Sequence, residues 1–308
     1  MRLTLLLAWS TIVRPLVASP SGAYKYLVTF GDSYTDCGRA AYFINNGHAP
    51  PAGTIFPSTF TPTYTGGYTW AEYAANTNPN VTLFDYAVGG AQLSPSLIPH
   101  TFNGGPSQDV LEYQVPTYQT EVKNASLYPG RTANNTVYAM WIGVNDFGIT
   151  GFLGGSERPN VDIAAWVNTT YTVIDQIYAS GGRRFVLFNQ AAIDLAPVYT
   201  QPGQYGYDNF KYFSNMNCYN TTDYVDKARL LTNAANTITD QGVQYQAKTA
   251  NRWPGSTISV FNAHQLMEDL YSNPGPYLDP PAIVNMPYSN CLTSGCTHSS
   301  NPPSAYMW

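Results

Sequence analysis

Five short apolar runs, separated by segments with helical spacing, place the strongest constraint on the fold of this chain. Each run contains β-branched or aromatic residues and ends at glycine or polar residues, which is typical of strands buried in a parallel sheet. The runs are residues 26–30, 81–87, 136–142, 184–189 and 257–262. Because helical segments lie between them, we predict an α/β fold with a five-stranded, doubly wound parallel sheet.

The segments between the runs predict several helices. A short helix is expected over residues 69–75, and a weaker one over 109–122, interrupted at Pro116. Asn160 is a plausible N-cap for a helix that Gly181 and Gly182 stop. The remaining expectations are a long amphipathic helix over residues 225–245, a helix to about residue 271 and a Pro/Gly/Thr-rich connection over residues 40–67.

Polar residues and glycines follow the first three runs, where each strand would end. Ser33 follows the first run, Gly90 the second and Asn145 the third. In an open α/β sheet, ligands bind beyond the carboxyl ends of the strands. We therefore predict Ser33 as a nucleophile, with an oxyanion hole formed by the Ser33 N–H, the Gly90 N–H and the Asn145 side chain. Each position taken alone also fits an ordinary turn or strand cap.

Three blocks carry a resemblance to a known family: FGDSYTD at residues 30–36, DYAVGGA at 85–91 and GVND at 143–146. The chain resembles the SGNH (GDSL) hydrolases, and more narrowly the secreted fungal carbohydrate esterases of family 16. The resemblance implies a flavodoxin-like three-layer α/β/α sandwich in which Ser33 attacks an ester carbonyl. We also assign Asp32 and Asp146 to substrate binding. Asp85 departs from the family, which often has Asn there.

The resemblance further implies an Asp-x-x-His near the C-terminus, with the histidine as general base. None of the four histidines here has Asp three residues before it. His48 and His100 lie in Pro/Gly-rich loops, His264 is expected to cap or pack a helix, and His298 is a weak substitute. Residues 304–308 resemble the run that precedes the missing block. We therefore interpret the chain as C-terminally incomplete, continuing into Asp-x-x-His and a final helix.

The N-terminus predicts export. Residues 1–18 combine a basic residue, an apolar run and small residues at the end, as a secretory signal peptide does. We expect residues 19–308 to form one secreted, extracellular domain, and no later stretch is long and apolar enough to span a bilayer. Asn-x-Ser/Thr sequons, which fit a secreted glycoprotein, occur at Asn80, Asn124, Asn134, Asn168 and Asn220.

Four cysteines in an exported chain indicate disulfides. Cys291 and Cys296 are close enough in sequence to close a small loop. Cys37 and Cys218 are then a pairing by elimination. Neither pair has the spacing and histidines of a zinc site, so we predict no metal and no cofactor.

Composition restricts the partners. Charged residues make up 11% of the chain, the net charge is −5, and no Lys/Arg cluster is present, which argues against nucleic acid. The resemblance implies a small acyl ester or an acetylated oligosaccharide as substrate. Two alternatives stay open: a GDSL lipase, although residues 40–67 are not apolar enough to suggest a lid, and a secreted sugar-binding pseudoenzyme without the base. The oligomeric state is left open.

Overall fold

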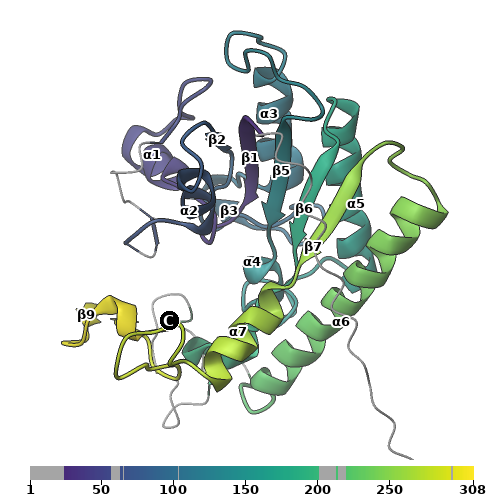
Figure 1. Cartoon of the computed structure of the whole chain (residues 1–308). Helices are drawn as coiled ribbons and strands as arrows, with labels where there is room; N and C mark the ends of the chain where they lie inside the picture. Colours follow the sequence, from purple (N-terminus) through teal and green to yellow (C-terminus); the bar gives the residue numbers. More distant parts are fainter. Residues whose placement is uncertain are drawn as a thin grey trace, which may run out of the picture.

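The computed structural model describes residues 24–56, 63–64, 66–102, 104–200, 213, 220–292 and 294–308. The predicted signal peptide lies outside these residues. A five-stranded parallel sheet has the order β2-β1-β5-β6-β7 (Figure 1). Its strands are β1 Tyr26–Gly31, β2 Thr82–Asp85, β5 Thr136–Trp141, β6 Arg184–Phe188 and β7 Thr257–Phe261. Numbered along the chain this is the 2-1-3-4-5 order of flavodoxin-like sheets, which confirms the predicted fold class.

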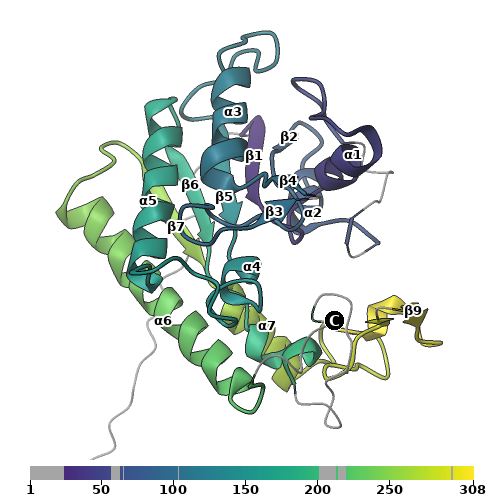
Figure 2. The ribbon, with the colours of Figure 1, turned by 180° about the vertical axis from the view of Figure 1, so that it is seen from behind.

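Helices cover both faces of the sheet. Helices α3, α5 and α6 lie on one face, and α1 and α2 on the other (Figures 1 and 2). Their bounds, with the short α4 after β5 and α7 after β7, are α1 Arg39–Asn46, α2 Trp70–Asn76, α3 Val115–Glu121, α4 Val144–Phe147, α5 Ile163–Ala179, α6 Tyr224–Gln244 and α7 Ala263–Ser272. In the described part of the chain no helix is both long and apolar enough to cross a membrane.

Shorter elements connect these layers. A short hairpin follows the loop after β2. Its strands have two residues each, β3 Thr101–Phe102 and β4 Gly105–Pro106. The π-helical and 3₁₀ turns are η1 Val110–Gln114, η2 Ile193–Leu195, η3 Pro197–Tyr199, η5 Tyr245–Thr249 and η6 Pro303–Ala305. Of these, η1 directly precedes α3, η5 directly follows α6, η2 and η3 follow β6, and η6 lies near the C-terminus.

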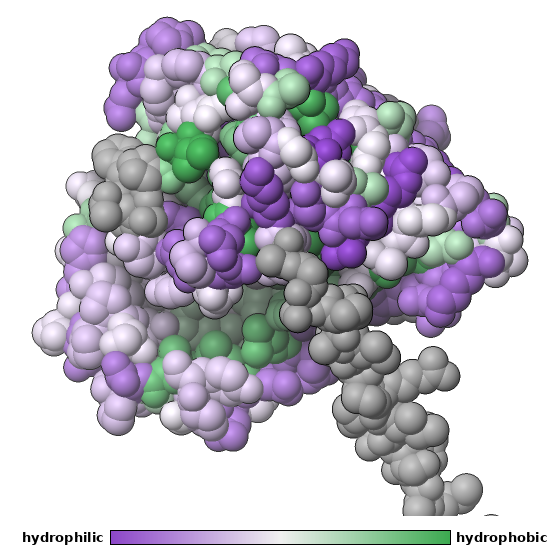
Figure 3. Space-filling model, turned by 45° about the horizontal axis from the view of Figure 1, so that its top comes forward, coloured by the Kyte–Doolittle hydropathy of each residue, from purple (hydrophilic) through white to green (hydrophobic). Residues whose placement is uncertain are grey.

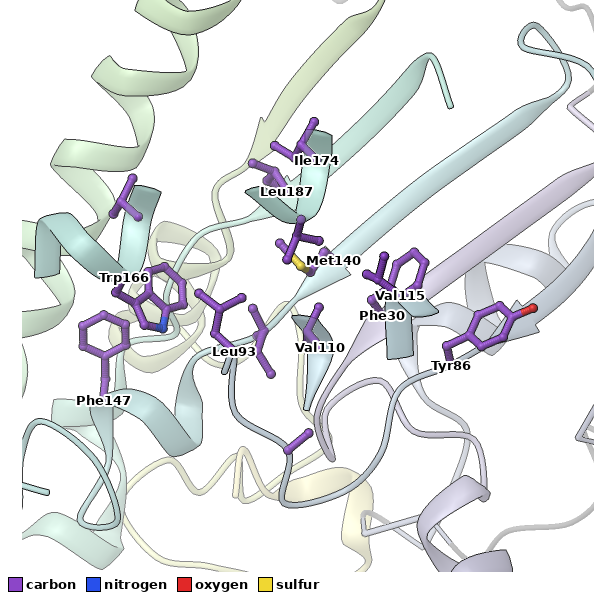
Figure 4. Close-up of a cluster of buried hydrophobic side chains, with 14 of the residues drawn as sticks. Phe30, Tyr86, Leu93, Val110, Val115, Met140, Phe147, Trp166, Ile174 and Leu187 are labelled. Carbon is purple, nitrogen blue, oxygen red and sulfur yellow. The ribbon is translucent and has the colours of Figure 1, made fainter. Parts of the chain in front are cut away.

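The core lies between the sheet and helices α3 and α5. Val28 and Phe30 of β1 are fully buried, and Phe30 lies beside Met140 of β5 (Figure 4). The Phe30 ring lies 5.7 Å from both the Tyr86 and the Tyr118 ring centroids. All six residues of β1 are buried, as expected for a central strand covered on both faces.

The opposite face of the sheet carries an aromatic row formed by the last residues of three strands. Trp141 and Phe188 stack with ring centroids 5.2 Å apart, and Phe188 lies 4.9 Å from Phe261. Trp70 of α2 packs over Phe188 at 4.4 Å. At the edge strand β7 this cover ends, because Phe261 is 44% exposed.

Local details depart from the sequence predictions at two helix starts. Asp162, not Asn160, is the N-cap of α5, because its carboxylate accepts the Ala165 N–H at 2.8 Å. Asn160 instead has a φ of 66°. Pro116 does not interrupt its helix, since the π-helical turn η1 shifts the hydrogen-bond pattern just before a residue that has no N–H to donate.

Helix α1 was not predicted, because its sequence lies in a segment that is otherwise rich in Pro, Gly and Thr. The Asp36 carboxylate accepts the backbone N–H groups of Gly38, Arg39 and Ala40 at 2.6 to 2.9 Å. These are N–H groups that a helix start leaves without an acceptor, so Asp36 stabilises the helix from outside it.

After α7, residues 273–308 form a C-terminal unit with its own small hairpin, β8 Ser289–Leu292 and β9 Gly295–His298. Figure 1 shows this unit, in yellow, below the carboxyl ends of the strands. The predicted Cys291–Cys296 disulfide is present. The pairing by elimination is wrong, since Cys37 is a free, buried thiol; Cys218 itself lies outside the described residues.

Phe30→Ala should lower the free energy of unfolding by about 3–5 kcal/mol, because it leaves a cavity in a fully buried aromatic cluster. Urea unfolding followed by tryptophan fluorescence measures the loss. Phe261→Ala, the same change at a half-exposed edge position, is the matched control and should cost less than half as much. Equal losses would contradict the core described above.

Candidate active site

The loops after β2, β1 and β5 lie side by side because these strands are neighbours in the sheet. Thr29 of β1 pairs with Asp85 of β2, and Gly31 of β1 pairs with Trp141 of β5. Ser33 follows β1 by two residues and occupies the central loop. The surface is hollowed between the main body and the lower part of the molecule, and hydrophobic residues line part of the hollow (Figure 3).

Ser33 sits in a tight turn at the end of β1. The Asp32 carbonyl accepts the N–H groups of Thr35 at 3.0 Å and Asp36 at 2.9 Å. Gly31 has a φ of 155°, and a Cβ at this position would lie 2.2 Å from the Trp141 carbonyl oxygen. Glycine is therefore required where the strand turns into the loop. Ser33 is half-buried, and its hydroxyl makes no hydrogen bond to another described residue.

Gly90 lies at the exposed tip of a turn after β2. The Ala91 N–H donates to the Val88 carbonyl at 3.0 Å, and Gly90 has a φ of 86°. A positive φ at the third position is the mark of a type II turn, where glycine is preferred. A Cβ on Gly90 would meet no atom within 4 Å, so open space lies beside this backbone.

Asn145 reaches from the β5 loop to the Gly90 turn. Its Nδ2 donates to the Ala91 carbonyl at 2.8 Å. Its own backbone carbonyl accepts the Gln92 side-chain N–H at 3.1 Å. These two bonds join the loop after β5 to the loop after β2. An amide group has two N–H bonds, and the second makes no bond to another described residue.

Two carboxylates join the Ser33 turn to its neighbours. Asp36 accepts the Gly89 N–H at 2.7 Å, which ties the β1 loop to the Gly90 turn. Asp32 accepts the Tyr34 N–H at 3.0 Å and also faces the N–H groups of Gly143 and Val144. The three loops that carry Ser33, Gly90 and Asn145 are thus connected pairwise.

Asp32 and Asp146 were predicted to bind substrate, and their burial argues against direct contact with it. They are 1% and 0% exposed. Asp146 Oδ1 accepts the Leu93 N–H at 3.0 Å and the Trp166 indole N–H at 2.9 Å, while Oδ2 is buried without a partner among the described residues. Both carboxylates position loops from inside the protein, a role that the sequence does not distinguish from ligand binding.

Burial governs the electrostatics of these acids. Loss of solvation raises the pKa of Asp32 to about 7, against the lowering effect of the Tyr34 N–H and with a further rise from the Asp146 charge. Burial likewise raises the pKa of Asp146 to about 7. Asp85, which holds the Cys37 N–H at 2.8 Å, has its pKa raised to about 7 by burial and by the charge of Asp36.

The four histidines are bonded elsewhere. His100 Nε2 lies 3.2 Å from Asp109 Oδ1, and His48 is exposed, with Nδ1 2.8 Å from its neighbour's carbonyl. His264 is buried at the start of α7, with Nδ1 3.2 Å from the Gln190 carbonyl, as the packing interpretation expected. His298 is exposed on β9, and its Nδ1 lies 2.9 Å from a serine hydroxyl of β8. Within the described residues no hydrogen bond joins a histidine to Ser33.

The raised carboxyl pKa values predict a pH-dependent stability. A carboxyl group whose pKa rises from 3.8 to about 7 on folding favours the folded state fully below pH 3.8. This contribution is lost as the pH rises through about 7. We therefore expect a higher melting temperature at pH 5 than at pH 8, measured by circular dichroism. Asp146→Asn should reduce the difference, whereas Asp223→Asn, at an exposed position, should preserve it. Equal melting temperatures at both pH values would refute the expectation.

Known proteins are similar to this chain over the region that contains these loops. The model of the GDSL-like lipase/acylhydrolase family matches residues 27–279. An acetylesterase from Hypocrea jecorina is 35% identical over 298 residues, which cover 95% of this chain and 85% of that protein. An acetylesterase from Thermothelomyces thermophilus is 30% identical over 183 residues, 56% of each chain.

Solved structures include a member of the lipolytic G-D-S-L family from Veillonella parvula, with 14% identity, a TM-score of 0.38 and coverage of 84% of this chain and 88% of that one. An acetylxylan esterase from Geobacillus stearothermophilus has 13% identity, a TM-score of 0.32 and coverage of 72% and 81%. The family match spans most of the chain and includes the Ser33, Gly90 and Asn145 loops. The chain therefore belongs to the GDSL-like lipase/acylhydrolase family.

Proposed function

We propose that this protein is a secreted serine esterase that removes acyl groups, chiefly acetyl, from carbohydrate esters. As a member of its family and a relative of acetylesterases, it is an ester hydrolase. The observation that carries the finer proposal is the set of hydrogen bonds that connects the Ser33, Gly90 and Asn145 loops. A nucleophile and oxyanion donors must be held at fixed positions relative to one another, and these bonds do so.

The proposed reaction has two acyl-transfer steps. The Ser33 oxygen attacks the ester carbonyl, and its proton passes through a base to the leaving alcohol. The N–H groups of Ser33, Gly90 and Asn145 Nδ2 stabilise the negative oxygen of the tetrahedral intermediate. Water then hydrolyses the acyl-serine by the same route in reverse and releases the acid.

The donors are suited to this role by their other bonds. One N–H of Asn145 Nδ2 is held by the Ala91 carbonyl, which orients the second. Gly90 is exposed and presents its backbone beside open space. Donors that are already oriented need no rearrangement when charge develops, and this is the source of their catalytic effect.

The base is the part that the described contacts do not supply. A serine hydroxyl is a weak nucleophile at neutral pH without a group that removes its proton. Each histidine is bonded elsewhere, so we assign none of them this role. This observation favours a second candidate function, a secreted protein that binds acetylated sugars beside Ser33 without turning them over.

Several features support a carbohydrate ester as ligand. The two relatives compared above are named acetylesterases. Tyr34, next to Ser33, and Trp141 are half-buried with ring centroids 4.9 Å apart, so they offer aromatic surface beside the nucleophile. For secretion, the support is that the five sequon asparagines are all exposed, as glycosylation requires.

Ser33→Ala should reduce p-nitrophenyl acetate hydrolysis to the solvent background. Asn145→Ala should lower kcat by about 100- to 1,000-fold, the usual effect of removing one oxyanion donor, with a much smaller change in KM. Steady-state kinetics measure both, and Ser180→Ala at the end of α5 is the control for loss of a hydroxyl. Wild-type turnover by Ser33→Ala would sink the esterase proposal. Binding of acetylated xylo-oligosaccharide without any Ser33-dependent turnover would favour the second candidate.

Acyl-chain preference separates an acetylesterase from a lipase. We expect kcat/KM for p-nitrophenyl acetate to exceed that for the octanoate by at least tenfold, since a difference of about 1.4 kcal/mol in transition-state binding is sufficient. Parallel assays below the micelle-forming concentration of the octanoate test this. A preference for octanoate would assign the protein to the lipases.

A further inference from the structure

We propose that Asp36 is a positioning residue that sets the direction of the Gly90 N–H; this inference rests on the proposed esterase function. Asp36 is 2% exposed, so its carboxylate does not touch a substrate. It lies in the same turn as Ser33, because its own N–H donates to the Asp32 carbonyl at 2.9 Å. One short turn therefore holds both the nucleophile and the group that orients the oxyanion loop.

The Asp36 carboxylate divides its four hydrogen bonds between two structures. Oδ1 accepts the N–H groups of Gly38 at 2.7 Å and Arg39 at 2.6 Å, and Oδ2 accepts that of Ala40 at 2.9 Å. These three bonds stabilise the start of α1. The fourth runs from the Gly89 N–H to Oδ2 at 2.7 Å and crosses to the loop after β2. This fourth bond is the one that acts on the proposed oxyanion hole.

The geometry of the turn explains why this bond matters. Type I and type II turns differ by a flip of their central peptide, and in the turn over residues 88–91 that peptide carries the Gly90 N–H. The φ of 86° at Gly90 places the turn in the type II form. Asp36 accepts the Gly89 N–H, which belongs to the peptide before the central one. Asn145 donates to the Ala91 carbonyl, which follows the central peptide. Held from both sides, the Gly90 N–H keeps one direction.

Asp36→Asn separates the two roles. Asparagine is a good helix N-cap, so its side-chain oxygen can continue to accept N–H groups of α1. Its NH₂ group would replace Oδ2 and face the Gly89 N–H, donor against donor, and it would also oppose the Ala40 N–H. The α1 start keeps two of its three bonds, those of Gly38 and Arg39 to Oδ1. Glu121→Gln is the matched control, because Glu121 is also a buried acid and its bonds, to the Gly53 N–H and the Tyr86 hydroxyl, do not involve Asp36 or the turn over residues 88–91.

The experiment combines steady-state kinetics with amide hydrogen exchange. The whole protein is exchanged, and mass spectrometry of its peptides then reports exchange at residues 88–91. For Asp36→Asn we expect kcat on p-nitrophenyl acetate to fall about 10- to 100-fold, part of the effect of losing a donor, with KM within about twofold. Exchange at residues 88–91 should accelerate, while α1 stays protected. Glu121→Gln should keep kcat within about threefold and leave exchange at residues 88–91 unchanged.

Three outcomes would overturn the inference. Exchange at residues 88–91 unchanged in Asp36→Asn would show that the carboxylate does not hold the turn. A wild-type kcat in Asp36→Asn, in an enzyme that Ser33→Ala inactivates, would overturn the role of Asp36 alone. Wild-type turnover by Ser33→Ala would instead remove the proposed function, and the role of Asp36 with it.

Discussion

The pairing of β1 with β2 on one side and β5 on the other is the constraint on which the proposed site depends. All six residues of β1 are buried, so its register is determined by packing on both faces. Because the three strands are parallel, their carboxyl ends meet at one edge. Loops that are 50 or more residues apart in sequence are thereby brought within hydrogen-bonding reach, as the Asp36–Gly89 and Asn145–Ala91 bonds show.

Buried carboxylates hold the loops that the strand order brings together. Asp32, Asp36, Asp85 and Asp146 are all at most 3% exposed and accept mainly backbone N–H groups rather than pairing with cations. Burial raises the pKa of each of them, which shows that their charged forms are costly inside the fold. A carboxylate accepts several N–H bonds at once, so this cost is offset by loops held in one arrangement.

The sequence predicted the parts of the fold that depend on local pattern. The strands were found within three residues at each end, because buried parallel strands form continuous apolar runs. The Cys291–Cys296 disulfide was found because five residues of separation restrict the choice of partner. Helix α1 and the Asp162 cap were missed. Helix α1 depends on the Asp36 carboxylate outside it, and the start of α5 depends on which of two nearby polar residues can reach an N–H group.

The sequence by itself determined the fold class and the three strand ends that carry Ser33, Gly90 and Asn145, because apolar periodicity and glycine positions express backbone requirements directly. The tertiary structure alone decided the roles of the acids. Asp32 and Asp146 look in sequence like ligand-binding residues beside the proposed nucleophile, yet both are buried inside the protein. The importance of Asp36 follows from its bond to Gly89, 53 residues away in sequence. A side chain's solvent exposure and its distant partners follow from how the layers pack, and no local pattern records them.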